Sequence, residues 1–471
     1  MIRRAHRAPG PLDERLTRGR QLVAFPVVTI LVLALLAACS TTSSAPTNVT
    51  IYPNLVQARD EGFHKLAGHP PFTVNFGATL EGGSGTLSYA WDQDGDGETD
   101  SEAINPKPFT YVEPGEYTAT VSVSNEMGRR VRDEQRIVVI GEPEWPEWRF
   151  GVAEHLNRGH GLYASNVEVE TAAQLISEAG IEAVRLDLTW AAVQPDSRDK
   201  YEWKDYDYLV GLSQRYGLDL LPVIAYSAEW ASTAQEATDF HDWSMAPPSP
   251  TEYAWFAYKA VDRYKSNVPA WEVWNEPNTS IFWQPGPDPA QYAELLRHAY
   301  LAIKFADPKA VVVLGGLAND ESANMPQYVW YPPEEFLQAV YDQGAGPYFD
   351  AVGRHPYTHP SLGTGYLVSQ LGQLRDVMVA NGDGDKPIWL TEYGLSAVPA
   401  DGVTDEIQGA WLTQSFDALW PVDYVPVVVW YNFREKGTDP NDREQNYGLI
   451  GNDWTIKPAY EAYKSYIANS S

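Results

Sequence analysis

The chain of 471 residues is short of basic residues and nearly devoid of cysteine. Its 34 lysines and arginines stand against 63 acidic residues, and the formal charge of −29 argues against a nucleic-acid-binding protein, whose footprint would be basic. The single cysteine, Cys39, excludes an intramolecular disulfide and a cysteine-based zinc site. The acidic balance fits a protein whose partners are neutral or cationic.

Apolar and aromatic residues, in contrast, are plentiful. Hydrophobic residues make up 44% of the chain and aromatic residues 13%, which is ample for a packed core and excludes a wholly disordered protein. The length predicts about three domains, or one large domain with a small companion. The 17 tryptophans and 28 tyrosines suit the flat faces of sugars, but they equally suit any large core.

The N-terminal segment has the pattern of an export signal. Six arginines lie among the first twenty residues, and an apolar run over 22–38 follows them. The run ends in Leu36-Ala37-Ala38-Cys39, which resembles the bacterial lipobox, where the cysteine is lipidated. We therefore predict a lipoprotein signal peptide over 1–38 and a tether over 39–46, with an uncleaved membrane anchor or a buried thiol as the alternatives. Either export reading places the remaining chain outside the cytoplasm, and the resemblance implies a lipid anchor in a bacterial cell membrane.

Residues 47–142 have the pattern of a small β-sandwich. Apolar and polar residues alternate over 117–124, as in a strand with one buried face, and 137–140 is a second apolar run. The segments 91–97 (Trp-Asp-Gln-Asp-Gly-Asp-Gly) and 109–117 resemble the two signatures of PKD domains. That resemblance implies an all-β spacer or adhesion module.

The same acidic segment raises the question of a metal. Carboxylates at alternating positions next to a glycine are typical of calcium loops, and the candidates for a structural Ca²⁺ site are Asp92, Asp94, Asp96 and Asp100. An EF-hand would need a glutamate at position 103, where Ala103 stands. A tight acidic hairpin turn without metal is the alternative.

A linker over 143–147 carries two prolines and leads into the large domain, 148–471. We expect few contacts across this linker, so that the large domain folds and acts without the β domain.

Short apolar runs alternate with amphipathic segments throughout the large domain. The expected strands are 150–153, 183–188, 218–225, 270–274, 311–315, 351–355, 387–391 and 425–430. The expected helices include 167–179, 206–216, 289–305, 334–343, 406–419 and 457–467. This order and size predict an α/β fold, a (β/α)8 TIM barrel. A doubly wound sheet is the alternative, but it would more naturally carry a glycine-rich phosphate loop after its first strand, and none is visible.

Two glutamates stand at the ends of predicted strands. Glu276 follows the fourth strand within Trp-Asn-Glu-Pro-Asn (274–278), and Glu392 follows the seventh within Thr-Glu-Tyr-Gly (391–394). Both lie at the face of a TIM barrel where active sites form. A pair of carboxylates about 5 Å apart is what cleavage of a glycosidic bond with retention requires. A single such glutamate could as well serve a helix cap or a surface ion pair.

These residues resemble the retaining glycoside hydrolases of clan A, most of all family 39, with family 5 next. The resemblance implies that Glu276 is the acid/base and Glu392 the nucleophile, and that catalysis needs no cofactor. It also implies a set of substrate-binding residues: Arg185, Asn275, His355, Tyr357 and Trp430. Among them, Arg185 would hold the nucleophile ionised and Asn275 would donate to the sugar 2-hydroxyl.

We therefore expect an extracytoplasmic, lipid-anchored, retaining glycoside hydrolase that cleaves β-linked polysaccharide or oligosaccharide by double displacement. We expect it to be a monomer that binds no nucleic acid. Two alternatives stay open: a non-catalytic surface lipoprotein for polysaccharide binding or adhesion, and a transglycosylase on the same scaffold.

Overall fold

The computed structural model describes residues 44–156, 162–234 and 240–470. The expected signal peptide and Cys39 lie outside these residues. Residues Ser43–Ser471 form one compact unit. Within the described ranges, no helix has both the length and the apolar character needed to cross a membrane.

The N-terminal part of the unit is the expected β domain. Its strands are β1 (Pro46–Tyr52), β2 (Ala67–Gly68), β3 (Phe72–Val74), β4 (Gly77–Gly82), β5 (Leu87–Asp92), β6 (Phe109–Tyr111), β7 (Gly115–Asn125) and β8 (Arg130–Val139). The order β2-β8-β7-β5 forms a four-stranded sheet, and β1-β4 and β3-β6 form two antiparallel pairs. The alternation along β7 buries Ala119, Val121 and Val123 completely, as the period-two pattern predicts.

Two helical segments of this domain were not predicted, α1 (Leu55–Glu61) and η1 (Phe63–Lys65). Phe63 is fully buried, and its ring centroid lies 5.2 Å from that of Tyr258 and 5.4 Å from that of Phe305. These two partners lie on barrel helices, so one hydrophobic cluster contains residues of both domains. The expectation of few contacts between the domains is therefore wrong, because α1 and η1 pack on barrel helices and Arg136 of β8 donates to the carbonyl of Phe305.

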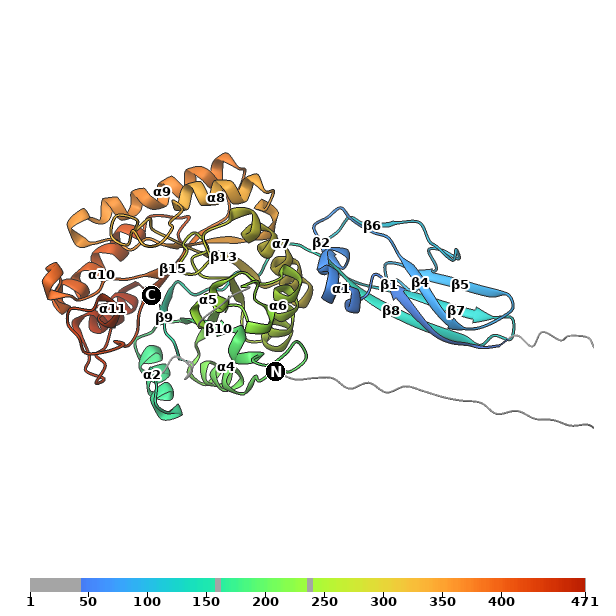
Figure 1. Ribbon diagram of the computed structural model, residues 1–471, viewed down its shortest axis with the longest axis horizontal. Helices are drawn as coiled ribbons and strands as arrows, with labels where there is room; N and C mark the ends of the chain where they lie inside the picture. Colours follow the sequence, from blue (N-terminus) through green and yellow to red (C-terminus); the bar gives the residue numbers. More distant parts are fainter. Residues whose placement is uncertain (1–43, 157–161, 235–239, 471) are drawn as a thin grey trace, which may run out of the picture. The chain divides into compact units, whose positions relative to one another are not determined.

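The C-terminal part is a TIM barrel, as predicted (Figure 1). Eight parallel strands close in the order β10-β11-β12-β13-β14-β15-β16-β9. They are β9 (Phe150–Ala153), β10 (Ala183–Thr189), β11 (Asp219–Ala225), β12 (Ala270–Val273), β13 (Val311–Ala318), β14 (Ala351–His355), β15 (Ile388–Tyr393) and β16 (Val427–Tyr431).

Helices surround this barrel. The main ones are α2 (Asn166–Glu178), α4 (Lys204–Tyr216), α6 (Pro250–Tyr264), α7 (Pro289–Ala306), α8 (Pro333–Asp342), α9 (Thr364–Ala380), α10 (Asp405–Leu419) and α11 (Pro458–Ser470). The short helices α3 (Trp190–Val193) and α5 (Phe240–Met245) lie in the loops after β10 and β11. The prediction did not name α6 and α9, which occupy the two remaining connections between strands.

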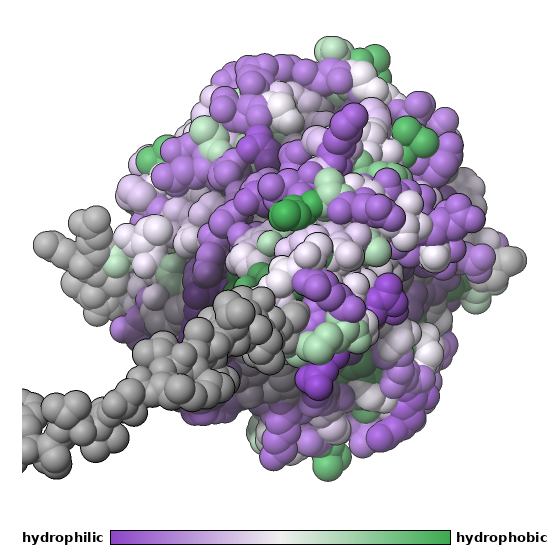
Figure 2. Space-filling view, turned by 90° about the vertical axis from the view of Figure 1, so that its right-hand side faces the viewer, coloured by the Kyte–Doolittle hydropathy of each residue, from purple (hydrophilic) through white to green (hydrophobic). Residues whose placement is uncertain are grey.

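The alternation of side chains along each strand decides which residues reach the barrel interior. On β16, Val427, Val429 and Tyr431 belong to the interior cluster, whereas Val428 and Trp430 belong to the cluster between strands and helices. The surface seen in Figure 2 is mostly hydrophilic, with apolar residues scattered singly, as is ordinary for a folded protein of this charge.

Candidate active site

Arg185 of β10 lies at the centre of the polar cluster in the barrel. Its Nε donates to Oε2 of Glu272 at 2.6 Å and its Nη2 donates to Oδ1 of Asn275 at 2.9 Å. Its Nη1 donates to Oε1 of Glu392. The arginine side chain is only 4% exposed, so these ion pairs are shielded from water. One guanidinium thus orients two carboxylates and the amide next to Glu276.

His355 at the end of β14 joins the two predicted catalytic carboxylates. Its Nδ1 lies 2.8 Å from Oε1 of Glu276 and 3.7 Å from Oε2 of Glu392. On the other side of the ring, Nε2 lies 3.1 Å from Oγ1 of Thr391. The nearest ligand atoms of Glu276, His355 and Glu392 all lie within 4.8 Å of one another. These residue types can bind a metal, but the guanidinium of Arg185 already neutralises Glu392.

The backbone after β12 is bent to bring Glu276 into this cluster. Trp274 has φ 70° and Glu276 has φ 43°, left-handed conformations that are strained for residues with a side chain. The N–H of Glu276 donates to the carbonyl of Gly316 at 3.1 Å. A Cβ on Gly316 would lie 1.9 Å from Nε2 of His355, so only glycine allows β13 to pass so close to the site.

The surroundings of the two carboxylates shift their pKa values in opposite directions. Burial alone would raise the pKa of Glu392, but the neighbouring imidazole of His355, the guanidinium of Arg185 and the hydroxyl of Tyr357 together outweigh it and lower that pKa. Burial raises the pKa of Glu276 and outweighs the lowering effects of His355 and Arg185, while the negative charge of Glu392 adds to the rise. Glu392 is therefore favoured as an anion, and Glu276 keeps its proton to a higher pH than an ordinary glutamate does.

Aromatic side chains complete the wall around Glu392. Tyr357 donates to Oε2 of Glu392 at 3.0 Å, as expected for an orienting residue. Trp430, predicted to be one of the substrate-binding residues, is fully buried and packs edge-on against Tyr393 and Phe416 on the outer face of β16. That expectation is wrong because the strand's alternation turns Trp430 outward and turns the next residue, Tyr431, toward the site.

Of the predicted site residues, the structure brings together Glu276, Glu392, Arg185, Asn275, His355 and Tyr357. Sequence reasoning missed Thr391 and the pair of His155 and Asp187, whose Nδ1 and Oδ2 lie 3.7 Å apart. Asp187 stands two positions after Arg185 on the same strand and therefore on the same face, which is the signal that could have identified it.

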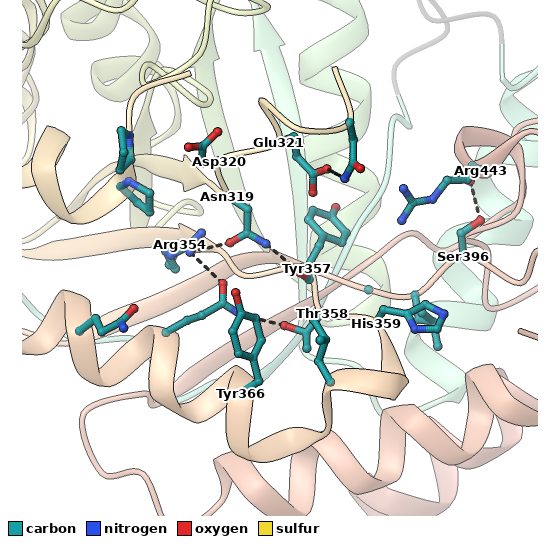
Figure 3. A pocket seen from close by; sticks show the side chains of 18 of the residues that line it. Asn319, Asp320, Glu321, Arg354, Tyr357, Thr358, His359, Tyr366, Ser396 and Arg443 are labelled. Atoms are coloured by element: carbon teal, nitrogen blue, oxygen red, sulfur yellow. Dashed lines mark hydrogen bonds between the residues drawn. The ribbon is translucent and has the colours of Figure 1, made fainter. Parts of the chain in front are cut away.

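A cavity of about 380 Å³ lies next to Tyr357 at the same end of the barrel (Figure 3). Loops after β13, β14, β15 and β16 contribute its walls. Figure 3 shows Tyr357 at its centre, with Arg354 and Asp320 on one side and Arg443 and Ser396 on the other. The lining is polar and carries both charge signs, so it offers many partners for hydroxyl groups.

The acidic segment of the β domain forms a tight turn. Both carboxylate oxygens of Asp92 accept backbone N–H groups, from Gly95 at 2.7 Å and Gly97 at 3.0 Å. Oxygens of Asp92, Asp94 and Asp96 lie within 4.8 Å of one another. The turn by itself accounts for these carboxylates, and calcium binding stays a prediction.

Two family models match the chain. The PKD domain model matches residues 65–135, and the model described as the glycosyl hydrolase catalytic core matches residues 254–463. The second match contains Glu276, His355, Tyr357 and Glu392.

Solved structures share the fold at low sequence identity. A family 39 glycoside hydrolase from Bacteroides cellulosilyticus WH2 is 21% identical with a TM-score of 0.53, over 86% of this chain and 81% of its own. A monomeric β-xylosidase from Caulobacter crescentus CB15 is 19% identical with a TM-score of 0.55, over 70% and 69%. The GH5_18 protein of Streptomyces cattleya, in complex with GlcNAc, is 18% identical with a TM-score of 0.52, over 70% and 80%. The solved structures show that the chain shares their barrel fold, and the matching models indicate a glycoside hydrolase that carries a PKD domain and a glycosyl hydrolase catalytic core.

Proposed function

We propose that the enzyme hydrolyses β-linked oligosaccharides or polysaccharides with retention of anomeric configuration. The observation that carries this proposal is the pair of carboxylates, Glu276 and Glu392, whose nearest oxygens lie within 4.8 Å of each other. This spacing fits a direct attack by one carboxylate and leaves no room for the water that an inverting enzyme holds between them.

In the first step an oxygen of Glu392 attacks the anomeric carbon, and the bond from that carbon to the leaving oxygen breaks. Glu276 gives its proton to the leaving oxygen, so the departing sugar is a neutral alcohol. In the second step Glu276 takes a proton from a water molecule, the hydroxide oxygen bonds to the anomeric carbon, and Glu392 leaves as a carboxylate. Asn275, held by Arg185, faces the same space and can donate to the sugar 2-hydroxyl.

The decisive experiment follows the anomer formed first. Aryl β-xylosides and β-glucosides are the first substrates to test, since solved structural neighbours are named as a β-xylosidase and a glucosidase. Proton NMR at early times should show the β-anomer of the released sugar before it equilibrates. A product that first appears as the α-anomer would contradict the retaining mechanism, and products longer than the substrate would favour transglycosylation.

The cavity beside Tyr357 supports a substrate longer than one sugar. Tyr366 at its rim is 48% exposed, which gives an aromatic face on which a further sugar ring can stack. We expect Tyr366→Ala to raise KM severalfold for a trisaccharide or longer substrate and to leave an aryl monoglycoside unaffected. Val379→Ala, at an exposed apolar side chain near the other end of the same helix α9, is the matched control. Equal effects on both substrates would contradict this assignment.

The proposal includes anchoring outside the cytoplasm by a lipid on Cys39. It rests on the sequence pattern that ends at Cys39. We expect Cys39→Ser to move the protein from the membrane fraction to the soluble fraction in a bacterial host. A variant that still sediments with membranes and keeps its signal segment would instead support an uncleaved anchor.

A further inference from the structure

A line of buried hydrogen bonds leads from Glu272 in the barrel interior to Glu276 at its mouth. Oγ1 of Thr391 lies 3.0 Å from Oε1 of Glu272 and 3.1 Å from Nε2 of His355. Nδ1 of the same imidazole lies 2.8 Å from Oε1 of Glu276. Glu272, Thr391 and His355 are all fully buried, so their polar atoms must find hydrogen-bond partners within the protein.

The direction of the first bond follows from the charge of Glu272. This carboxylate pairs with Arg185 through Oε2 and accepts the N–H of Gly316 at Oε1, so it acts only as an acceptor. The hydroxyl proton of Thr391 therefore points at Glu272. The side of the hydroxyl that faces His355 is a lone pair, which requires the proton of the imidazole to be on Nε2.

The tautomer of His355 then decides the state of its other partner. A neutral imidazole with its proton on Nε2 presents a lone pair at Nδ1. With this neutral imidazole, the contact of 2.8 Å between Nδ1 and Oε1 of Glu276 is a hydrogen bond only when the proton is on Glu276, whereas an imidazolium would instead donate to a carboxylate there. The other charged or titratable groups around the ring are Glu392, Arg185 and Tyr357, and the guanidinium of Arg185 is shared between Glu392 and Glu272.

We propose that Thr391 and Glu272 are positioning residues that fix the tautomer of His355 and thereby hold Glu276 in its acid form before substrate binds. This inference rests on the proposed role of Glu276 as proton donor. Once Glu276 has given its proton to the leaving oxygen, its carboxylate faces a lone pair at Nδ1. That repulsion favours recovery of a proton from water in the second step, which returns the site to its starting state.

Two variants at one position test this proposal. Thr391→Val keeps the shape of the side chain but removes the acceptor for Nε2–H, whereas Thr391→Ser keeps the hydroxyl. In Thr391→Val the imidazole can move its proton to Nδ1 and donate to the carboxylate of Glu276. Such a bond stabilises the anion, so the basic limb of kcat/KM should move to lower pH by about one unit, while Thr391→Ser should follow the wild type.

The leaving group supplies a second kinetic measure. For a glycoside with a poor leaving group, kcat/KM of Thr391→Val at pH 7 should fall at least about tenfold, because protonation limits the rate. For a dinitrophenyl glycoside, whose departure needs little protonation, the fall should stay within about threefold. An equal loss on both substrates with an unmoved basic limb would mean that the threonine has only a structural role.

Histidine NMR measures the tautomer without any substrate. In protein labelled with ¹⁵N-histidine, the His355 signals are identified by their loss in His355→Gln. We expect a protonated Nε2 and an unprotonated Nδ1 in the wild type and in Thr391→Ser, and a protonated Nδ1 in Thr391→Val. A protonated Nδ1 in the wild type would overturn the inference even if retaining activity is confirmed. The expected tautomer with no retaining activity would overturn the proposed function alone.

Discussion

At the barrel mouth, Glu276, His355 and Glu392 have potential ligand atoms within 4.8 Å of one another, and in the β domain Asp92, Asp94 and Asp96 do too. The two clusters differ in the groups that surround them. At the mouth, Glu276 and Glu392 are only 14% exposed; His355 lies against both, and Arg185 pairs with Glu392. In the β domain, Asp92 and Asp94 are half-buried and Asp96 is exposed, and all three accept backbone N–H groups of their own turn.

This difference shows why a cluster of acids is not by itself an active site. The aspartates of the turn have a local structural role, since each one accepts hydrogen bonds from backbone N–H groups a few residues away. The carboxylates of the mouth are held by partners far along the chain, in surroundings where burial and charge push their pKa values apart. Opposed protonation states at one pH are what general acid and nucleophile require.

The largest expected effect is the loss of activity on removal of the nucleophile. Glu392→Gln keeps the shape of the side chain but cannot form the covalent bond, so kcat should fall by about 10⁴-fold or more, while the thermal midpoint changes little. Asp94→Asn in the turn is the matched control and should leave kcat unchanged. If Glu392→Gln kept more than about a tenth of wild-type activity, its activation barrier would have risen by less than ~1.4 kcal/mol. The contrast between the barrel mouth and the acidic turn would then be lost.

The next effect should depend on the leaving group. Glu276→Ala should lower kcat/KM by about 10²- to 10⁴-fold for natural glycosides and much less for dinitrophenyl glycosides, because only the former need the proton. The basic limb of the pH profile, which reports loss of the proton from Glu276, should disappear. Added azide should accelerate the second step and give a β-glycosyl azide, detected by mass spectrometry and NMR. An α-azide would show that the covalent intermediate was assigned wrongly.

A third substitution should lower the stability of the protein without lowering its catalytic activity. Phe63→Ala removes a ring that is buried between the β domain and the barrel, which should destabilise the protein by about 3–5 kcal/mol. On a small aryl glycoside kcat/KM should stay within about twofold below the unfolding transition, because Phe63 makes no contact with Glu276 or Glu392. Val56→Ala, at a 74% exposed position on α1, is the control and should change neither quantity. A large loss of kcat/KM would mean that the β domain helps to shape the cleft.

The smallest effect is expected in the acidic turn. Asp92→Asn replaces one of two acceptor oxygens with a donor, so one backbone N–H loses its partner. Thermal unfolding should show a loss of about 1 kcal/mol, and activity should not change. Measuring the same variant with added Ca²⁺ tests the metal prediction, since only the wild type should then gain stability if the turn binds the ion.

The fold and most of the site could be predicted from the sequence. The glutamates stood at strand ends, and all parallel strands of a barrel end at the same face, so Glu276, Glu392 and His355 had to meet there. Trp430 was assigned to the wrong face, because an error of one residue in a strand reverses the side to which a side chain points. The contact of Phe63 was missed because an isolated aromatic residue has no periodicity to reveal it.

The sequence by itself therefore determined the order of the elements and the identity of the acids at the mouth, and it predicted the export signal. Only the tertiary structure decided which groups those acids face. Arg185 and Glu392 are 207 positions apart, and Thr391 and Glu272 are 119 apart. Local periodicity records which face of a strand is buried, but it contains no information about the side chain that arrives from the opposite wall of a closed barrel. The pKa shifts of Glu276 and Glu392 depend on those partners, which are distant in the sequence.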